Sequence, residues 1–174
     1  MTDETPATQQ WRIGDRIFLQ EKGVAEVTGF GRLPKGGPPV VSDDSTAPFL
    51  VLKTESGTAF IPQQAARDGL VRALLSVAEA SDLLTQLRDP RPVRFSNRSN
   101  LPQTSRDVMG KLDHVLNAKF LKGLYGLASP SHQEQMAIGM YETLCLKEVA
   151  LVLELNFDRL VKELRSLHAP KAEV

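Results

Sequence analysis

The feature of the chain that could do chemistry is a run of cationic side chains between residues 88 and 122. Eight basic and three acidic residues fall in this basic stretch, which gives it a net charge of +5. Lysine and arginine side chains bind phosphate oxygens, so contact with a nucleic-acid backbone is one interpretation. The other is that these side chains are simply solvated. The basic residues are Arg88, Arg91, Arg94, Arg98, Arg106, Lys111, Lys119 and Lys122.

Side chains that could catalyse a covalent step are scarce. Cys145 is the single cysteine, and no local motif supplies a histidine base for it, so we predict a buried packing thiol. The three histidines are scattered and form no metal-ligand pattern. The glycine-rich string GFGRLPKGG lacks the lysine spacing of a phosphate-binding loop. We therefore predict a protein that is not an enzyme and that uses neither a cofactor nor a metal.

The whole chain has a balanced composition. It has 174 residues, 41% of them hydrophobic, and equal numbers of basic and acidic residues. These values are typical of a globular chain with one domain or two small ones. No stretch approaches the ~20 apolar residues that span a bilayer, and the first ten residues are polar. Together with the lone cysteine, this predicts a cytoplasmic protein that binds no membrane, and we expect a monomer.

The first half of the chain reads as short strands separated by turns. Residues 1–10 carry no apolar pattern and are expected to form a flexible tail. Alternating and β-branched residues predict strands over 15–20, 24–32, 48–54 and 57–62. Residues 33–48 hold four prolines and are expected to form a long hairpin loop. Four to five short strands suffice for a small barrel but not for a large enzyme core.

From Ser76 onward the apolar residues follow a helical period. Ser76 and Glu79 form a capping box at the start of a helix that ends before Asp89-Pro90, and residues 89–104 read as a linker. Further helices are predicted from a Ser105 cap to Leu116, over 118–127, from Ser129-Pro130 through Leu153, and from an Asn156 cap to Pro170.

Strands followed by helices predict an α+β chain of two domains. We expect a small antiparallel β-barrel over residues 11–72, followed by an all-helical domain over residues 76–168. The joint falls between residues 65 and 76.

Several strings in this order resemble the CarD/CdnL family of bacterial transcription regulators. They are IGDRIFLQEKGVAEVTGF, FLVLKT, the Phe60-Ile61-Pro62 tripeptide, GLVRALLS, LRDP and QEQMAIGMYETLCLKEVALVLELNFDRLVKEL. The resemblance covers roughly residues 11–168. It implies a Tudor-like first domain, shared with transcription-repair coupling factors, that binds the β subunit of RNA polymerase. It also implies a helical domain that contacts promoter DNA and modulates the open complex, and hence a nucleoid-associated protein.

Pairing an edge strand of the first domain with a strand of the partner would supply main-chain hydrogen bonds, and residues 48–54 or 57–62 are the expected edge. Phe60 is alternatively a core residue. The residues assigned to polymerase binding are Arg32, Leu50, Leu52, Lys53, Phe60 and Pro62.

The chain departs from the family at the DNA side. Where the family carries a tryptophan wedge, this chain reads Asn97-Arg98-Ser99-Asn100, so Arg98 stands at the wedge position and Phe95 is a candidate displaced wedge. The expected DNA contact is therefore weak and largely independent of sequence, and the alternative is a protein-interaction module that does not bind DNA. The residues assigned to DNA are Arg94, Phe95, Asn97, Arg98, Arg106, Lys111, Lys119 and Lys122.

Overall fold

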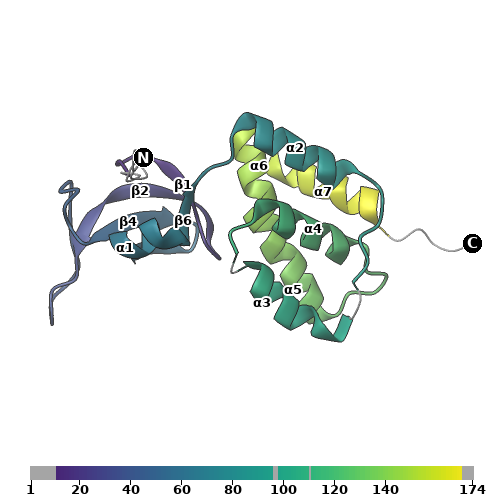
Figure 1. The fold of residues 1–174 in the computed structure, drawn as a ribbon, viewed down its shortest axis with the longest axis horizontal. Helices are drawn as coiled ribbons and strands as arrows, with labels where there is room; N and C mark the ends of the chain where they lie inside the picture. The colour runs from purple at the N-terminus through teal and green to yellow at the C-terminus, as the bar shows by residue number, and fades with distance from the viewer. Residues whose placement is uncertain (1–10, 96–97, 110, 170–174) are drawn as a thin grey trace, which may run out of the picture. The chain divides into compact units, whose positions relative to one another are not determined.

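The computed structural model describes residues 11–95, 98–109 and 111–169. The predicted tail, the Asn97 contact and the helix end at Pro170 lie outside these residues. The chain divides into two compact units with the boundary between Ala73 and Leu74. A sheet unit, up to Ala73, is followed by a helical unit, from Leu74 onward, so the α+β class is confirmed (Figure 1).

The sheet unit is built from antiparallel strands in the order β5-β4-β2-β1-β6, with β3 paired to the end of β2. Tight turns set the register. The β1–β2 turn places Glu21 and Gly23 at positive φ, and the β4–β5 turn places Gly57 there, where glycine has no Cβ to clash. The strands are β1 (Arg16–Leu19), β2 (Gly23–Arg32), β3 (Val40–Ser42), β4 (Phe49–Thr54), β5 (Gly57–Pro62) and β6 (Val71–Ala73).

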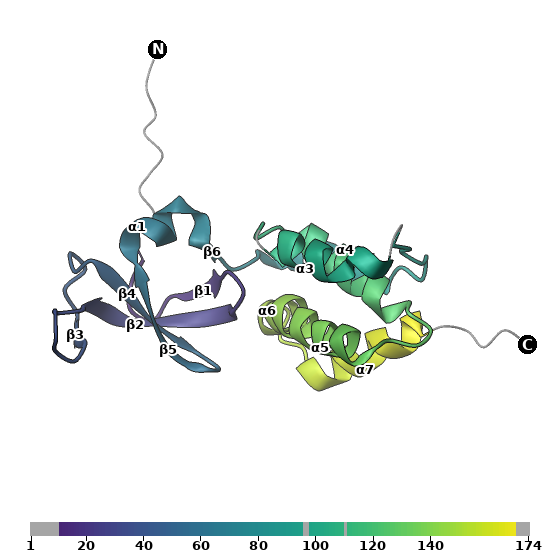
Figure 2. The same ribbon diagram turned by 90° about the horizontal axis from the view of Figure 1, so that it is seen from below.

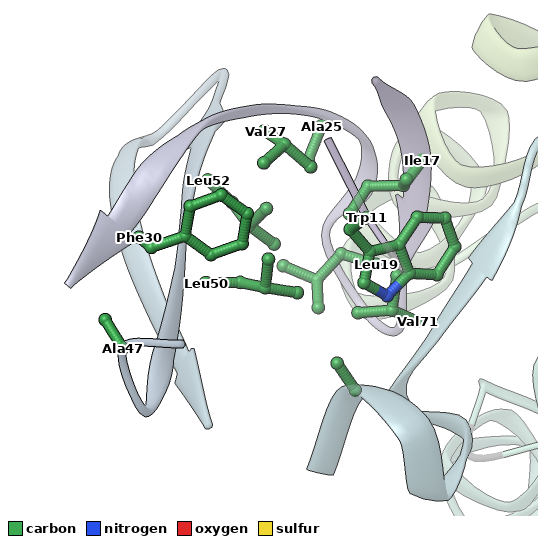
Figure 3. Packing of buried hydrophobic residues seen from close by; sticks show 11 residues of the cluster. Trp11, Ile17, Leu19, Ala25, Val27, Phe30, Ala47, Leu50, Leu52 and Val71 are labelled. Carbon is green, nitrogen blue, oxygen red and sulfur yellow. The ribbon is translucent and has the colours of Figure 1, made fainter. Parts of the chain in front are cut away.

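One apolar cluster holds the sheet unit together (Figure 3). Alternate residues of the strands point into it because successive side chains of a strand face opposite sides. Trp11, 9% exposed, joins the cluster, as does Ala66 from the helical connection after β5. The other members of the cluster are Ile17, Leu19, Ala25, Val27, Phe30, Ala47, Leu50, Leu52 and Val71.

The sheet is curved but open, so the predicted closed barrel is wrong. Closure would require the two end strands, β5 and β6, to pair with each other. The chain between them instead forms the helical turn α1 (Gln63–Ala65) and a π-helical segment (Ala66–Leu70). Ala66 of this segment is 3% exposed and covers the core. The expected loop over 33–48 also contains a strand, β3. The sequence pattern did not predict this strand because two prolines directly precede it.

The described residues of the helical unit form six α-helices. Side-chain caps start four of them, because the first N–H groups of a helix lack partners within the helix. Ser76 and Glu79 form the predicted capping box, and Asn156 caps the last helix as predicted. The helices are α2 (Val77–Arg88), α3 (Leu101–Met109), α4 (His114–Tyr125), α5 (His132–Tyr141), α6 (Lys147–Val152) and α7 (Phe157–His168).

Two layers of helices enclose the core of the helical unit. Figure 2 shows α3 and α4 in one layer and α5, α6 and α7 in the other. Helix α4 packs against α2, α3, α5 and α7, so its apolar side chains form the centre of the unit. The fully buried side chains include Leu83, Leu87, Leu121, Leu124, Tyr141, Leu146 and Leu164.

Three helix boundaries differ from the prediction. The linker is shorter, since a 3-10 turn (Arg98–Asn100) leads directly into α3. The predicted helix from Ser105 to Leu116 is broken where Leu112 adopts φ 50°, and Asp113 then caps α4 by accepting the N–H of Leu116 at 2.9 Å. The cap of α5 is Ser131 with Glu134 rather than Ser129.

The predicted long helix through Leu153 is real but contains a π-helical segment (Glu142–Leu146) between α5 and α6. A π turn holds an extra residue and is rare in helices. The apolar spacing of the sequence did not indicate it.

Candidate functional site

The first candidate site is the outer edge of β5. Among the described strands, β5 is hydrogen-bonded to β4 alone and ends the sheet. The Gln63 N–H donates to the Pro48 carbonyl at 2.8 Å, which makes residues 48 and 63 a hydrogen-bonded pair. Hydrogen-bonded and non-hydrogen-bonded pairs alternate along an antiparallel ladder, and the β4–β5 register is regular. The main-chain groups of Thr58 and Phe60 therefore point away from β4.

This docking edge, Thr58–Phe60, offers two N–H and two C=O groups to a partner strand. The next outward position is Pro62, which has no N–H and cannot continue the ladder. On the face away from the core, Phe60 lies opposite Val51 on β4 and is half-buried. Gly31 of β2 leaves room for its ring, because a Cβ at Gly31 would lie 3.2 Å from it. Phe60 is thus a surface-facing residue of the edge strand and not a member of the core cluster.

The other predicted polymerase-binding residues separate into buried and exposed groups. Leu50 and Leu52 were wrongly assigned as contacts, because both side chains are 0% exposed and belong to the core cluster on the central strand β4. Lys53 and Pro62 are exposed on β4 and β5. Arg32 is exposed and lies 3.6 Å from the Asp44 carboxylate. The Thr46 hydroxyl, followed by the Thr46 N–H, lowers the pKa of Asp44, and the Arg32 charge adds to this.

The second candidate site is the basic stretch. Several of its predicted DNA-binding side chains form contacts with other residues of the helical unit. The Arg98 guanidinium donates to both Glu134 oxygens, at 2.7 and 2.6 Å, and to the Ser129 carbonyl at 2.7 Å. This hydrogen bonding lowers the pKa of Glu134 to about 2. Arg98 is therefore held against the start of α5.

Lys122 was wrongly expected to reach DNA. Its side chain is 9% exposed, and its ammonium group lies 3.9 Å from the Asp89 carboxylate and donates to the Gln86 carbonyl at 3.4 Å. The Arg91 guanidinium binds the same carboxylate at 2.5 Å and holds the pKa of Asp89 well below its usual range. Helix α4 therefore carries Lys122 on its inner face, which a count of charges along the sequence does not reveal.

Phe95 is half-buried and packs on α4, and its assignment as a displaced wedge stays a prediction. Its ring centroid lies 5.2 Å from that of Phe120 on α4, in a tilted arrangement. A Cβ at Gly123 would lie only 2.6 Å from the Phe95 ring, so the ring sits directly on the α4 backbone. This packing holds the partly exposed ring against the helical unit.

Besides Arg98, which is exposed but paired with Glu134, four predicted DNA-binding residues are exposed: Arg94, Arg106, Lys111 and Lys119. The side chains of Arg94, Lys111 and Lys119 have no ion-pair or hydrogen-bond partner within residues 11–95, 98–109 and 111–169. Asn97 lies outside these residues. The structure thus leaves about half of the predicted phosphate contacts in a position to meet solvent or DNA.

A buried polar network in the helical unit was not predicted. The Tyr125 hydroxyl donates to Glu142 at 2.8 Å, and Arg165 donates to both oxygens of the same carboxylate at 2.6 and 2.7 Å. Burial, followed by the Glu142 charge, raises the pKa of the Tyr125 hydroxyl. His168 stacks on Tyr125 and reaches the Leu87 carbonyl at 2.5 Å. These contacts join α2, α4 and α7 to the π-helical segment, and no short sequence motif marks them.

The described residues contain no cluster of three or more histidine, cysteine, aspartate or glutamate side chains that could hold a metal ion. None of their helices is both long and apolar enough to cross a membrane. Cys145 is 5% exposed inside the helical unit.

No protein-family model matches this chain, and no curated protein sequence matches it.

Proposed function

We propose that this chain is a CarD-like transcription regulator that binds the β subunit of RNA polymerase through the docking edge. The observation that carries the proposal is the outward orientation of the Thr58 and Phe60 main-chain groups on a sheet that is open at β5. An open edge with unpaired N–H and C=O groups is a template for a partner strand. The resemblance of residues 11–168 to the CarD/CdnL family supplies the identity of the partner.

The proposed docking adds one strand of the polymerase to the sheet beside β5. Main-chain hydrogen bonds supply affinity, and the side chains of Phe60 and Lys53 beside them supply specificity. The sheet unit is the proposed counterpart of the family's Tudor-like domain, although its sheet is open. The chain acts stoichiometrically in this proposal and catalyses no reaction.

The helical unit is proposed to contact promoter DNA weakly and so to modulate the open complex. The contact uses the exposed cations Arg94, Arg106, Lys111 and Lys119 and no aromatic wedge. With about three phosphates neutralised, the logarithm of affinity should fall with the logarithm of salt at a slope of roughly −3. Docking on the polymerase then provides most of the affinity, and the DNA contact is local and sensitive to salt.

A second candidate is a polymerase-binding module that makes no DNA contact. The pairing of Arg98 with Glu134 and the burial of Lys122 favour it, because the first neutralises an exposed cation and the second removes a cation from the surface. In this candidate the helical unit binds only protein.

The docking proposal is tested with full-length Thr58→Pro and its matched control, Thr58→Val. Proline removes an outward N–H and leaves the β4–β5 ladder intact, whereas valine keeps the N–H and suits a strand. Loss of one intermolecular hydrogen bond of roughly 1 kcal/mol should weaken binding about fivefold. Affinity for purified RNA polymerase is measured by surface plasmon resonance, and thermal unfolding verifies that each variant folds.

Equal affinity of the two variants for polymerase would show that β5 does not pair with the partner. Absence of any polymerase binding by the parent chain would overturn the proposed function as a whole.

The DNA contact is tested by mobility shift of a duplex at low salt. Lys119→Gln and Arg94→Gln should each weaken the shift about two- to threefold, while Lys122→Gln, which changes a buried cation, should leave the DNA contact unchanged where the protein folds. A parent chain that gives no shift favours the second candidate.

A further inference from the structure

The helical unit contains a small pocket that the proposed polymerase contact does not use. The end of α2, the segment 89–93 that follows it and one face of α4 line this pocket. Its volume is about 270 Å³, just below the ~300–1,000 Å³ of sites for drug-sized ligands, so it suits one small chemical group. The charged residues that define this lysine pocket are Asp89, Arg91, Lys119 and Lys122.

Lys122 is a buried cation with unused hydrogen-bond donors. Its side chain is 9% exposed, although lysine is seldom buried without a close partner. The ammonium group has three N–H donors, and among the described residues only the Gln86 carbonyl accepts a hydrogen bond from it, at 3.4 Å. The Asp89 carboxylate lies 3.9 Å away, beyond hydrogen-bond distance. Two donors of this cation are therefore left for an acceptor in the pocket.

The charges around the pocket favour an anion as that acceptor. Arg91 neutralises Asp89, since its guanidinium binds this carboxylate at 2.5 Å. Helix α2 ends beside the pocket, and the carboxyl end of a helix carries about half a negative charge. Lys119 and Lys122, which are neighbours on one face of α4, leave an excess of about +1.5. A water molecule would accept the hydrogen bonds of Lys122 but would not offset this charge.

A phosphate group with at most one ester bond matches both the charge and the size of the pocket. Such a group carries about −1.5 to −2 at pH 7, and its oxygens accept charge-assisted hydrogen bonds from ammonium groups. A phosphate of the DNA backbone carries a single negative charge and has a sugar on each side. A terminal phosphate projects from one end of its molecule and can enter a small pocket.

We propose that the lysine pocket binds a dianionic phosphate group, as in inorganic phosphate or a small phosphomonoester. The buried Lys122 lies at the base of this site, and the exposed Lys119 lies at its rim. Binding of the phosphate group depends on neither proposed contact. Lys119 also belongs to the proposed DNA contact, so an occupied pocket would weaken that contact, and this consequence alone rests on the proposed function.

A titration without DNA or polymerase tests the site. Full-length protein labelled with ¹⁵N is titrated near neutral pH with inorganic phosphate, methyl phosphate and dimethyl phosphate, and chloride keeps the ionic strength constant. We expect saturable NMR shifts of the amide groups over 86–93 and 115–122 and of the Lys122 ammonium group with the first two ligands. Dimethyl phosphate, which has the single charge of a backbone diester, should bind at least about tenfold more weakly. The ligand that binds more tightly, inorganic phosphate or methyl phosphate, identifies the source of the group.

Variants of single lysines test the geometry. Lys122→Gln should weaken phosphate binding at least about tenfold, because it removes the buried cation, and thermal unfolding verifies its fold. Lys119→Gln changes an exposed side chain, which keeps the fold intact, and should weaken binding about threefold. Lys111→Gln is the matched control: it removes the same charge from an exposed residue outside the lining and should leave the affinity unchanged.

Three outcomes would overturn the proposal. Shifts with phosphate that do not exceed those with chloride would mean that water alone fills the pocket. Equal binding of dimethyl phosphate would mean that the site takes a backbone phosphate. An equal loss of affinity in Lys111→Gln and Lys119→Gln would mean that the anion is attracted by the whole surface and not by this pocket. None of these outcomes depends on whether the chain binds polymerase or DNA.

Discussion

The two units of this chain handle polar groups in different ways. The sheet unit buries a single apolar cluster and leaves main-chain groups of Thr58 and Phe60 unpaired at one edge among the described strands. The helical unit instead ties separate helices together with ion pairs, several of them between residues far apart in the sequence. An open strand edge binds through main-chain groups, so the charged residues of the sequence do not mark it. A run of basic residues, in contrast, can lose much of its net charge through ion pairs that form only in the folded chain.

The largest expected effect tests whether the two units are stabilised separately. Leu52→Ala removes a fully buried side chain from the sheet cluster and should cost about 2–5 kcal/mol in the stability of that unit. Trp11, the single tryptophan, belongs to the same cluster, so its fluorescence reports on the sheet unit, while far-ultraviolet circular dichroism reports mainly on the helices. In urea unfolding, the midpoint followed by Trp11 fluorescence should move to a lower urea concentration, and the midpoint followed by circular dichroism should not change.

Leu121→Ala is the matched control for this prediction, since it empties an equally buried position in the helical unit. It should move the dichroism midpoint and not the Trp11 midpoint. If each substitution moves both midpoints together, the two units unfold as one.

A second prediction concerns the packing that holds Phe95 away from solvent. Gly123→Ala places a Cβ about 2.6 Å from the Phe95 ring and should cost about 1–3 kcal/mol. Gly139→Ala is the control, because no atom lies within 4 Å of its Cβ position, and alanine in a helix should stabilise the unit by up to about 1 kcal/mol. Thermal unfolding measures both. Similar changes for the two alanines would mean that Phe95 does not pack on α4.

A third prediction compares a buried ion pair with an exposed one. Arg165→Met leaves the Glu142 carboxylate, 6% exposed, without its cation and should cost about 1–2 kcal/mol, since half of the arginine side chain lies in solvent. Arg88→Met breaks the exposed pair with Glu163 and should cost under about 0.5 kcal/mol. Denaturant unfolding measures the difference. If both substitutions lower the free energy of unfolding equally, the Glu142 network stabilises the fold no more than an exposed ion pair does.

The smallest effect concerns pH. Hydrogen bonding to Arg98 lowers the folded-state pKa of Glu134 from 4.5 to about 2, so this contact stabilises the fold above pH 4.5 and is lost as the pH falls toward 2. Arg98→Gln should return the Glu134 pKa toward 4.5 in a carboxyl NMR titration. Because half of the Arg98 side chain lies in solvent, which screens the pair, the substitution should change the stability at neutral pH only slightly. A Glu134 pKa that does not move would exclude the pair in solution.

The sequence predicted most of the strands and the capped helices because these follow local rules. Alternation indicated β1, β2, β4 and β5, and the Ser76 and Asn156 caps marked the starts of α2 and α7. The break at Leu112 was missed because the apolar spacing continues at helical period across it. Asp113 was the available signal, since an aspartate before an apolar run is a common helix cap.

The candidate site was harder to predict because it depends on contacts across the fold. Burial of Lys122 follows from which face of α4 meets α2, and the Arg98–Glu134 pair joins residues 36 positions apart. Leu50 and Leu52 were assigned to binding because a strand near an edge was expected, but β4 lies inside the sheet and their side chains point into the core. Spacing alone does not distinguish a central strand from an edge strand.

The π-helical segment Glu142–Leu146 fixes how the two halves of one long helix are turned relative to each other. Glu142 at its start binds Tyr125 and Arg165, and Glu148 just beyond it accepts the Leu75 N–H at 2.9 Å while 1% exposed. Deleting one residue here would convert the segment to a regular α-helix and rotate the second half by about 100° relative to the first. Only one of the two buried carboxylates could then keep its partners. The number of residues in this helix is therefore constrained more strongly than their types. Chains related to this one should tolerate substitutions in the segment far better than the deletion of a single residue.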